Sequence, residues 1–248
     1  MSNKEKISFS KLAALHHNLF GFDDPYLVER VYQCLKCITP HISPSENLKI
    51  ADFGCGDFRA TRLIRIQIPN ITNFYCVDVC PKSEDIDADF TVIPHDLNNE
   101  NLSIASDSVD FVYSLEVIEH LWNCDAFISN IRRILKSKGF LLITTPNFTA
   151  WYNRLLVPLG VLPVHYEVSF NKKYGRVLKP LGEGGKPAGH IRLFTPFALS
   201  RLLEDNGFKI LNCKGLQFLY SHYASALDRL FTIFPSMSSA FLIFARKR

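Results

Sequence analysis

Leu48-Lys49-Ile50-Ala51-Asp52-Phe53-Gly54-Cys55-Gly56 is a short apolar run that ends in a pair of glycines, and it is the clearest indication of the fold in this sequence. An apolar run of this length is typical of a buried β-strand. Paired glycines at the carboxyl end of a strand let the backbone turn sharply and approach a ligand closely. A helix expected over residues 61–68 would point its first amide groups at the same place. The stretch predicts a strand–turn–helix unit that binds a ligand, although a glycine pair alone is equally typical of a structural turn.

Short apolar runs and amphipathic segments alternate along most of the chain. The runs expected to form strands cover residues 48–53, 74–79, 90–93, 109–115, 140–144, 208–211 and 240–245. The run at 109–115 is almost continuously apolar, which is typical of a parallel strand buried on both faces. Strands that alternate with helices favour an α/β fold with a doubly wound, mostly parallel sheet. The sequence therefore predicts seven strands in one such sheet, with helices on both faces.

Residues 1–248 are expected to form one domain, since α/β folds of about 200–250 residues often fold as a unit. Residues 1–47 form an N-terminal helical segment in this prediction, with Asp24 as a helix cap and Pro25 as the first helical residue. Residues 147–194 separate the fifth strand from the next core helix. An interval of that length is typical of a lid or a binding loop, or of a lid with a small core of its own.

The composition excludes several classes of protein. A net charge of +4 is mildly basic, whereas a dedicated nucleic-acid binder is strongly basic. The seven cysteines are odd in number and scattered, and the pair Cys34 and Cys37 has no second pair to complete a zinc site. No apolar run reaches the roughly 18 residues of a membrane span, and the N-terminus lacks the pattern of a signal peptide. These features predict a cytoplasmic protein without a disulfide framework.

Chemistry-bearing residues recur at the expected strand ends that follow the glycine turn. The second strand ends in Asp78 and Val79, Asp96 and Leu97 follow the third, and the fourth ends in Leu115 and Glu116. An acidic residue after the second strand can accept hydrogen bonds from both hydroxyls of a ribose. The carboxyl ends of parallel strands meet at one edge of a sheet, where open α/β sheets bind ligands. The set therefore predicts a nucleoside site, although any one of these residues could serve the surface alone.

Arg59 distinguishes this expected site from a dinucleotide-binding site. The dinucleotide fingerprint is G-x-G-x-x-G, and Arg59 stands where its third glycine would be. A side chain at that position would obstruct the close passage of a pyrophosphate. We therefore expect a ligand with a single nucleoside.

With these residues in place, the chain resembles the class I S-adenosylmethionine-dependent methyltransferases over roughly residues 48–211. The resemblance is carried by residues 52–56, Asp78, 96–97, 114–121 and 142–147. The run Glu-Val-Ile-Glu-His-Leu at 116–121 and the segment 189–195 are similar to the branch that contains quinone-biosynthesis O-methyltransferases and many small-molecule and glycan methyltransferases. The resemblance implies a Rossmann-like sheet whose last strand is antiparallel, and S-adenosyl-L-methionine as the cofactor.

The resemblance also implies roles for single residues. Gly54 and Gly56 would lie against the methionine part of the cofactor, Asp52 would hold the loop or the cofactor's amino group, and Asp78 would bind the ribose. The full set expected at the cofactor is Asp52, Gly54, Cys55, Gly56, Asp78, Val79, Asp96, Leu97, Leu115 and Glu116. Many relatives carry a further glycine where this chain has Phe58, which implies a narrower loop here.

Transfer to a hydroxyl or ammonium group requires a base, and three histidines are candidates. His120 lies just past the fourth strand, whereas His165 and His190 belong to the insertion. Histidines in these places are also typical of helix starts and structural loops. Glu116 and Glu119 could hold a metal with His120, but the run explains itself without one, and no metal is expected.

The expected acceptor is a small molecule, a lipid or a glycan, methylated on oxygen rather than on nitrogen or carbon. Aromatic and basic residues of the insertion, among them Trp151 and Arg154, could grip a flat or anionic substrate. The apolar residues Leu155, Leu156, Leu159 and Val161 could touch a membrane surface if the acceptor is a lipid. An RNA methyltransferase is the main alternative, motivated by the mild positive charge and by the aromatic and basic insertion, and the absence of a recognisable RNA-binding module in the sequence argues against it. A non-catalytic interaction protein is another alternative.

Overall fold

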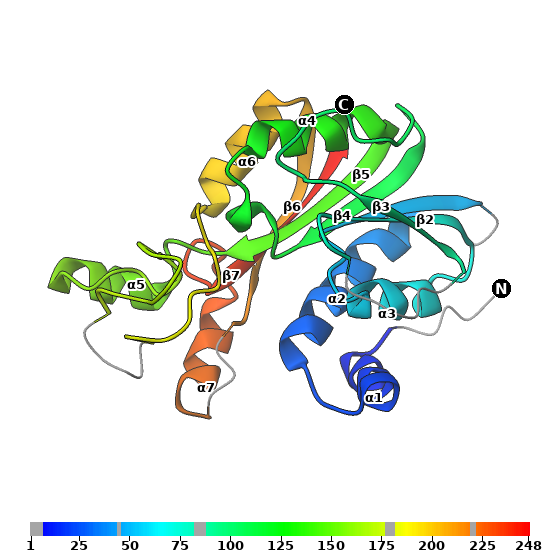
Figure 1. The fold of residues 1–248 in the computed structure, drawn as a ribbon. Coiled ribbons are helices and arrows are strands. Elements are labelled where there is room, and N and C mark those ends of the chain that lie inside the picture. Colours follow the sequence, from blue (N-terminus) through cyan, green and yellow to red (C-terminus); the bar gives the residue numbers. More distant parts are fainter. Residues whose placement is uncertain (1–6, 44–45, 82–87, 177–181, 219–221) are drawn as a thin grey trace.

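The structure is a computed structural model of the 248-residue chain, and it describes residues 7–43, 46–81, 88–176, 182–218 and 222–248. Its seven strands form one sheet in the order β3-β2-β1-β4-β5-β7-β6 (Figure 1). The strands are β1 (Leu48–Phe53), β2 (Ile71–Asp78), β3 (Phe90–Pro94), β4 (Val109–Leu115), β5 (Leu135–Pro146), β6 (Phe208–Leu216) and β7 (Ala240–Lys247). Strands β1 to β5 pair in parallel, whereas β7 is antiparallel to both β5 and β6. The predicted α/β Rossmann-like fold, with its antiparallel last strand, is confirmed.

Helices cover the two faces of this sheet and bury alternate strand residues. Helices α1 (Phe9–Phe20), α2 (Pro25–Ile38) and α3 (Arg59–Gln67) lie on one face, and α4 (Cys124–Ile134) and α6 (Pro196–Asp205) lie on the other (Figure 1). Neighbours along a strand enter different cores, so that Ile50 packs with α2 and Ala51 with α4. Both faces of the parallel strands are therefore buried, as the apolar run at 109–115 indicates.

Local capping decides where several helices begin. The Asp24 carboxylate accepts a hydrogen bond from the amide of Leu27 at 2.9 Å, and Pro25 is the first residue of α2, as predicted. Thr195 caps α6 in the same way, through the amide of Ala198 at 3.1 Å. Short 3-10 turns cover Thr39–His41 (η1), Ile118–His120 (η2) and Val157–Leu159 (η3).

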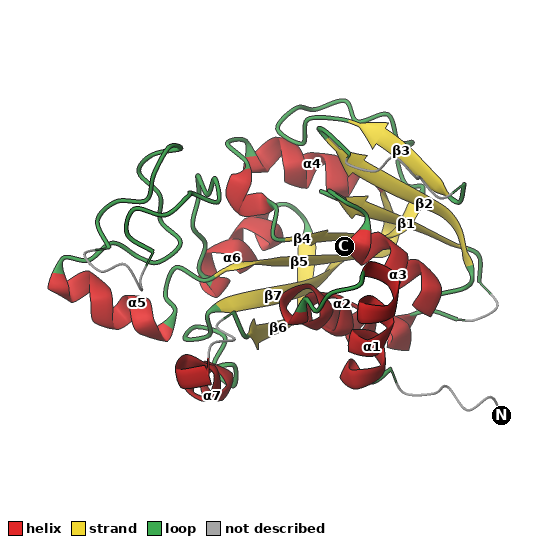
Figure 2. Ribbon diagram, turned by 60° about the horizontal axis from the view of Figure 1, so that its bottom comes forward, coloured by secondary structure: helices red, strands yellow, loops and turns green. Residues whose placement is uncertain are grey.

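The segment 147–194 leaves the sheet at the carboxyl end of β5 and returns to the same point. Its ends are joined by a bridge between Asn147 and Phe194, and the amide of Phe148 donates to the carbonyl of Phe194 at 2.9 Å. The segment contains helix α5 (Trp151–Leu156) and extends beyond one end of the sheet (Figure 2). Part of it, residues 177–181, falls outside the described residues. A further helix, α7 (His222–Phe231), joins β6 to β7 and is not predicted from the sequence.

Among the residues described, none of the helices is both long enough and apolar enough to cross a membrane.

Candidate active site

The sheet register brings the predicted ligand residues to one edge. Asp52 of β1 lies opposite Cys76 of β2 and Tyr113 of β4, while Asp78 lies opposite Pro94 of β3. The carboxyl ends of these four strands are therefore neighbours. The residues expected at the cofactor follow these ends, in agreement with the rule that open α/β sheets bind ligands there.

The glycine turn is tight at its first glycine and open at its second. Gly54 has a φ of +89°, and a Cβ built on it would lie 2.3 Å from Cγ2 of Val117. Gly56 has a φ of +51°, and a Cβ there would meet nothing within 4 Å. The intervening Cys55 is buried. Gly54 is thus required by its conformation and its neighbour, and Gly56 leaves the backbone accessible to a ligand.

Phe58 also has a positive φ, of +63°, yet its side chain points away from the turn. The ring is fully buried and stacks on Phe90, with ring centroids 6.1 Å apart and an interplanar angle of 5°. Phe58, which stands where many methyltransferases carry a further glycine, therefore places its side chain in the core.

The Asp78 carboxylate closes the glycine turn. One oxygen accepts a hydrogen bond from the amide of Gly56 at 2.9 Å, and the other accepts from the amide of Cys80 at 3.0 Å. Two residues 22 positions apart are joined directly by the first of these bonds. Val79, next to Asp78, is exposed. The carboxylate thus lies beside the open glycine, where it could also accept from a ligand's hydroxyls.

The third and fourth strand ends contribute differently. Asp96 accepts hydrogen bonds from the amide and the side chain of Asn98, at 3.0 and 2.8 Å, and Leu97 is buried in the core beneath it. Leu115 is half-buried and packs against the core formed with α1, α2 and α3. Glu116 has a φ of +57°, a strained conformation for a residue with a side chain.

Glu116 is held by the N-terminal helical segment. The Tyr26 hydroxyl donates a short hydrogen bond to its Oε2, and Nε of Arg30 lies 3.4 Å from its Oε1. Arg30 also stacks on the Tyr26 ring, 3.4 Å from its centroid, and donates to the carbonyl of Gln217 at 2.8 Å. Burial raises the pKa of Tyr26, so its hydroxyl remains a donor at neutral pH. Helix α2 is thereby fixed across the carboxyl edge of the sheet.

Sequence reasoning missed Tyr26 and Arg30. They lie 90 and 86 residues from Glu116, so no local spacing connects them. The one available signal is a charged residue beside the apolar stripe of a predicted helix, because Arg30 is 1% exposed.

Asp52 is buried, and a single oxygen of its carboxylate accepts two hydroxyls. Thr61 of α3 donates at 2.6 Å and Tyr113 of β4 at 2.7 Å. The side chain therefore ties β1 to both neighbouring elements and holds the base of the loop. Burial raises the pKa of Asp52 to about 7, against the lowering effect of the two hydroxyls.

Asp52→Asn should remove part of the pH dependence of stability. The carboxyl titrates near 3.9 when unfolded and near 7 when folded, so the folded state retains its proton between these values. The free energy of unfolding then falls as the pH rises from about 4 to about 7. Relative to wild type, the variant should gain a few kcal/mol over this range, at about 1.4 kcal/mol per pKa unit. Urea denaturation of both proteins at several pH values measures the difference, and a constant difference would contradict the assignment.

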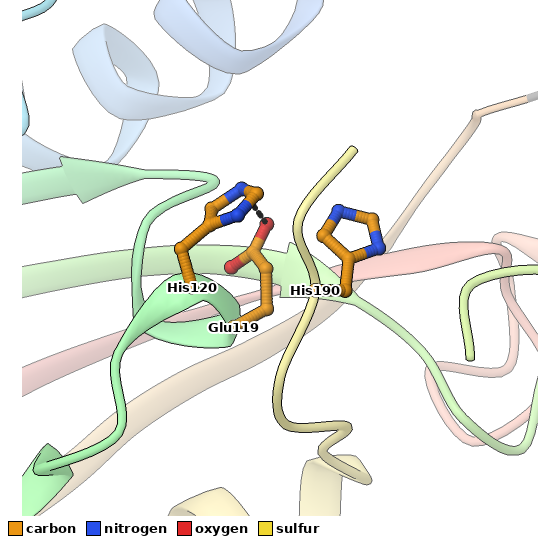
Figure 3. Close-up of side chains that lie close together, drawn as sticks. All are labelled: Glu119, His120 and His190. Carbon is orange, nitrogen blue, oxygen red and sulfur yellow. Dashed lines mark ion pairs between the residues drawn. The ribbon is translucent and has the colours of Figure 1, made fainter. Parts of the chain in front are cut away.

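Three titratable side chains converge where the insertion returns to the sheet: Glu119, His120 and His190 (Figure 3). Nδ1 of His120 lies 3.1 Å from the carbonyl of Gly189, and its Nε2 lies 3.9 Å from Oε1 of Glu119. The rings of His120 and His190 have centroids 4.9 Å apart. A carbonyl accepts only from a protonated nitrogen, so the Gly189 contact leaves Nε2 of a neutral His120 with its lone pair.

Glu119 is buried under this cluster. Thr145 donates to its Oε2 at 2.9 Å, whereas Oε1 has no hydrogen-bond partner among the described residues. Burial and the nearby Glu116 raise the pKa of Glu119 well above its usual range. The backbone carbonyl of Glu119 accepts from the amides of Ile191 and Arg192, which anchors the end of the insertion here.

The other two predicted bases lie deeper in the insertion. Nδ1 of His190 donates to the carbonyl of His165 at 3.1 Å, and burial together with the charge of His120 lowers the pKa of His190. His165 is almost wholly buried, and its Nε2 lies 3.1 Å from the Tyr152 hydroxyl. Burial lowers the pKa of His165 to about 3. The two rings are therefore neutral at physiological pH.

One carboxylate oxygen of Glu119 and a nitrogen from each of His120 and His190 lie within 4.8 Å of one another. Nitrogen and carboxylate ligands at such separations could hold a divalent cation.

A methyltransferase-domain family model matches residues 26–212, well over half of the chain. The chain belongs to the methyltransferase domain family. Its fold and its relatives identify it as a class I S-adenosylmethionine-dependent methyltransferase, an enzyme whose cofactor is S-adenosyl-L-methionine.

Similar curated proteins include the ubiquinone biosynthesis O-methyltransferase of Rickettsia felis, which is 26% identical in an alignment of 236 residues that covers 88% of this chain and 86% of that protein. The Bartonella quintana protein of the same name is 27% identical over 203 residues, covering 78% and 73% of the two chains.

Among solved structures, a Haloferax volcanii protein in complex with the Trm112 methyltransferase activator has a TM-score of 0.58 at 14% identity, covering 97% of both chains. An S-adenosylmethionine-dependent methyltransferase from Mesorhizobium loti has a TM-score of 0.54 at 17% identity, covering 87% of this chain and 97% of that one. At such identities the structural likeness establishes the fold alone.

Proposed function

We propose that this methyltransferase acts on an oxygen of a small-molecule, lipid or glycan acceptor, with His120 as the general base. The observation that carries the proposal is the pair of contacts of His120, whose Nδ1 faces the Gly189 carbonyl and whose Nε2 faces Glu119. Relatives named O-methyltransferases, similar over most of the chain, support oxygen as the acceptor atom.

The carboxyl edge of the sheet fits the cofactor. The open backbone at Gly56 suits the methionine part, and the Asp78 carboxylate beside it suits the ribose hydroxyls. We assign Asp96 and Leu97 to the border of the adenine, and Leu115 and Glu116 to the wall of the pocket at β4. The helix α2 residues that hold Glu116 would then shield this wall from water.

The bound cofactor supplies an electrophilic methyl group, and the chain must supply orientation and a proton acceptor. The Gly189 carbonyl fixes the proton of His120 on Nδ1, so Nε2 can accept the proton of an acceptor hydroxyl. Oε1 of Glu119 lies on the same side, has no hydrogen-bond partner among the described residues, and would accept a hydrogen bond from the resulting imidazolium. His120 is 36% exposed, which leaves it accessible to an acceptor.

His190 and His165 are assigned to positioning rather than to proton transfer. Each is tied to a partner, His190 to the backbone of His165 and His165 to Tyr152. The pKa of about 3 makes His165 too weak a base to hold a proton near neutral pH. Together they form the wall between His120 and helix α5.

Incubation with methyl-labelled S-adenosylmethionine and a panel of acceptors tests the proposal. We expect label on a phenolic or other hydroxyl acceptor, located by mass spectrometry as an O-methyl group. Amines and total RNA should remain unlabelled. Labelled RNA, with salt-sensitive binding, would replace the proposal with the RNA alternative.

A further inference from the structure

The outer surface of the insertion is apolar where α5 and η3 meet solvent. Leu155 is 63% exposed, Val157 47% and Leu159 77%. The opposite side of the same helix is buried, because Tyr152 faces His165 and Asn153 donates to the carbonyl of Phe148. Leu155 of α5 and Val157 and Leu159 of η3 are therefore turned outward, whereas Tyr152 and Asn153 face inward.

Helix α7 and the turn after it have the same inverted pattern. Leu227, Leu230, Ile233 and Phe234 are exposed, the last three by more than half. Asp228 of the same helix is fully buried, where it accepts hydrogen bonds from Nε1 of Trp151 at 3.0 Å and from the amide of Phe218 at 2.9 Å. Exposed apolar side chains that gather on one side of a helix are typical of a surface that contacts a partner or a membrane.

These two apolar surfaces belong to one end of the molecule. Trp151 of α5 stacks on Phe231 of α7, with ring centroids 5.5 Å apart. Arg154 donates to the carbonyl of Ser236 at 3.1 Å. Both views draw α5 and α7 at the end of the sheet where the insertion extends (Figures 1 and 2). We call the set Leu155, Val157, Leu159, Leu230, Ile233 and Phe234 the α5–α7 face.

Two arginines, Arg154 and Arg229, adjoin this face, and Arg154 belongs to a positively charged segment. Residues 147–194 contain seven Lys and Arg against two Asp and Glu, a net of +5 (7 − 2), whereas the whole chain has +4. The insertion therefore accounts for all of the net positive charge of the chain. Arg154 and Arg229 are exposed next to Leu155 and Leu230, and neither forms an ion pair with a described carboxylate.

We propose that the α5–α7 face docks this protein on an anionic lipid bilayer. Exposed aliphatic and aromatic side chains would enter the headgroup boundary while neighbouring arginines meet anionic headgroups, and the two signals together give stable peripheral binding. The cationic surroundings favour an anionic bilayer over a second copy of this chain, whose matching face would carry the same charge. The proposal concerns binding and is independent of the acceptor.

Sedimentation with lipid vesicles tests this proposal. The wild-type protein should bind vesicles of phosphatidylcholine and phosphatidylglycerol, bind pure phosphatidylcholine far more weakly, and lose affinity as salt is raised. The double variant Leu159→Ser/Phe234→Ser should lower the partition constant by at least about 10-fold. Arg229→Glu should lower it by roughly 5-fold or more.

Phe197→Ser is the matched control, because Phe197 on α6 is 77% exposed, the same fraction as Leu159. It should bind vesicles as the wild type does, and circular dichroism should show every variant folded. Failure of the wild type to bind anionic vesicles overturns the proposal, as does an equal loss with Phe197→Ser. A dimer that Leu159→Ser/Phe234→Ser converts to monomer, with vesicle binding unaltered, would assign the face to a second copy instead.

Discussion

The Asp78→Ala variant is expected to bind S-adenosylmethionine at least about 100-fold more weakly than the wild type. Without the carboxylate, the proposed hydrogen bonds from both ribose hydroxyls would be lost, and a hydrogen bond to a charged group contributes about 1.5–3 kcal/mol. Two such bonds amount to at least about 3 kcal/mol, and each 1.4 kcal/mol is a factor of ten in affinity. The variant also loses the acceptor for the Gly56 amide, which loosens the turn that lies against the ligand. Isothermal titration calorimetry measures the change.

Two further variants separate ligand binding from loop disorder. Asp78→Asn retains an oxygen for the Gly56 amide but has one acceptor fewer, so its loss of affinity should be intermediate. Asp89→Asn is the matched control, because Asp89 is an exposed carboxylate paired with Arg65 outside the carboxyl edge. Unchanged cofactor binding in Asp78→Ala, with the fold intact by thermal melting, would remove Asp78 from the site.

Local signals account for what the sequence predicts well. The seven strands follow from short apolar runs, and the start of α2 follows from Asp24 and Pro25, which act within one turn of helix. Strand limits were less accurate, since β5 begins at Leu135 rather than at residue 140. Its first residues include Lys136 and Lys138, which resemble a loop in the sequence, although Lys136 forms an ion pair with Asp110 of β4. Pairing with a distant neighbour overrides the local preference there.

Helix α7 illustrates a different failure. A surface helix is recognised by apolar residues at the spacing of its buried side. In α7 the leucines at 227 and 230 are exposed and Asp228 is buried, so the pattern is the reverse of the one sought. The sequence signal fails because burial in this helix depends on contacts with distant residues, such as the hydrogen bond from Trp151 to Asp228.

The candidate site also contains residues that local sequence signals predict and residues that they do not. Gly54, Asp78 and Glu116 can be found from the sequence, since each follows a strand and the parallel sheet then brings the strand ends together. Their partners cannot, because they come from distant segments: Tyr26 for Glu116, and Gly189, 69 residues away, for His120. The edge of the sheet is thus predictable, whereas the tautomer of a base depends on where a long insertion returns.

His120→Ala should lower kcat for the proposed oxygen methylation by about 10²–10⁴-fold, the contribution of a positioned base. Cofactor affinity should not change, because the proposed role of His120 is at the acceptor hydroxyl. In the wild type kcat should rise with pH to a plateau, since Nε2 must be unprotonated to accept a proton, and the variant should lack this rise. Added imidazole should restore part of the rate in the variant.

His41→Ala is the control for this variant, because His41 is an exposed histidine that lies against Phe140 and Phe244, away from the carboxyl edge. It should retain the wild-type kcat and pH profile. The base assignment fails if His120→Ala keeps the rise of kcat with pH. A wild-type rate that disappears with a chelator and returns with a divalent cation would instead make His120 a metal ligand, together with Glu119 and His190, whose ligand atoms lie within 4.8 Å of one another. The two roles differ in one measurable respect, because removal of divalent cations abolishes the rate only if His120 is a metal ligand.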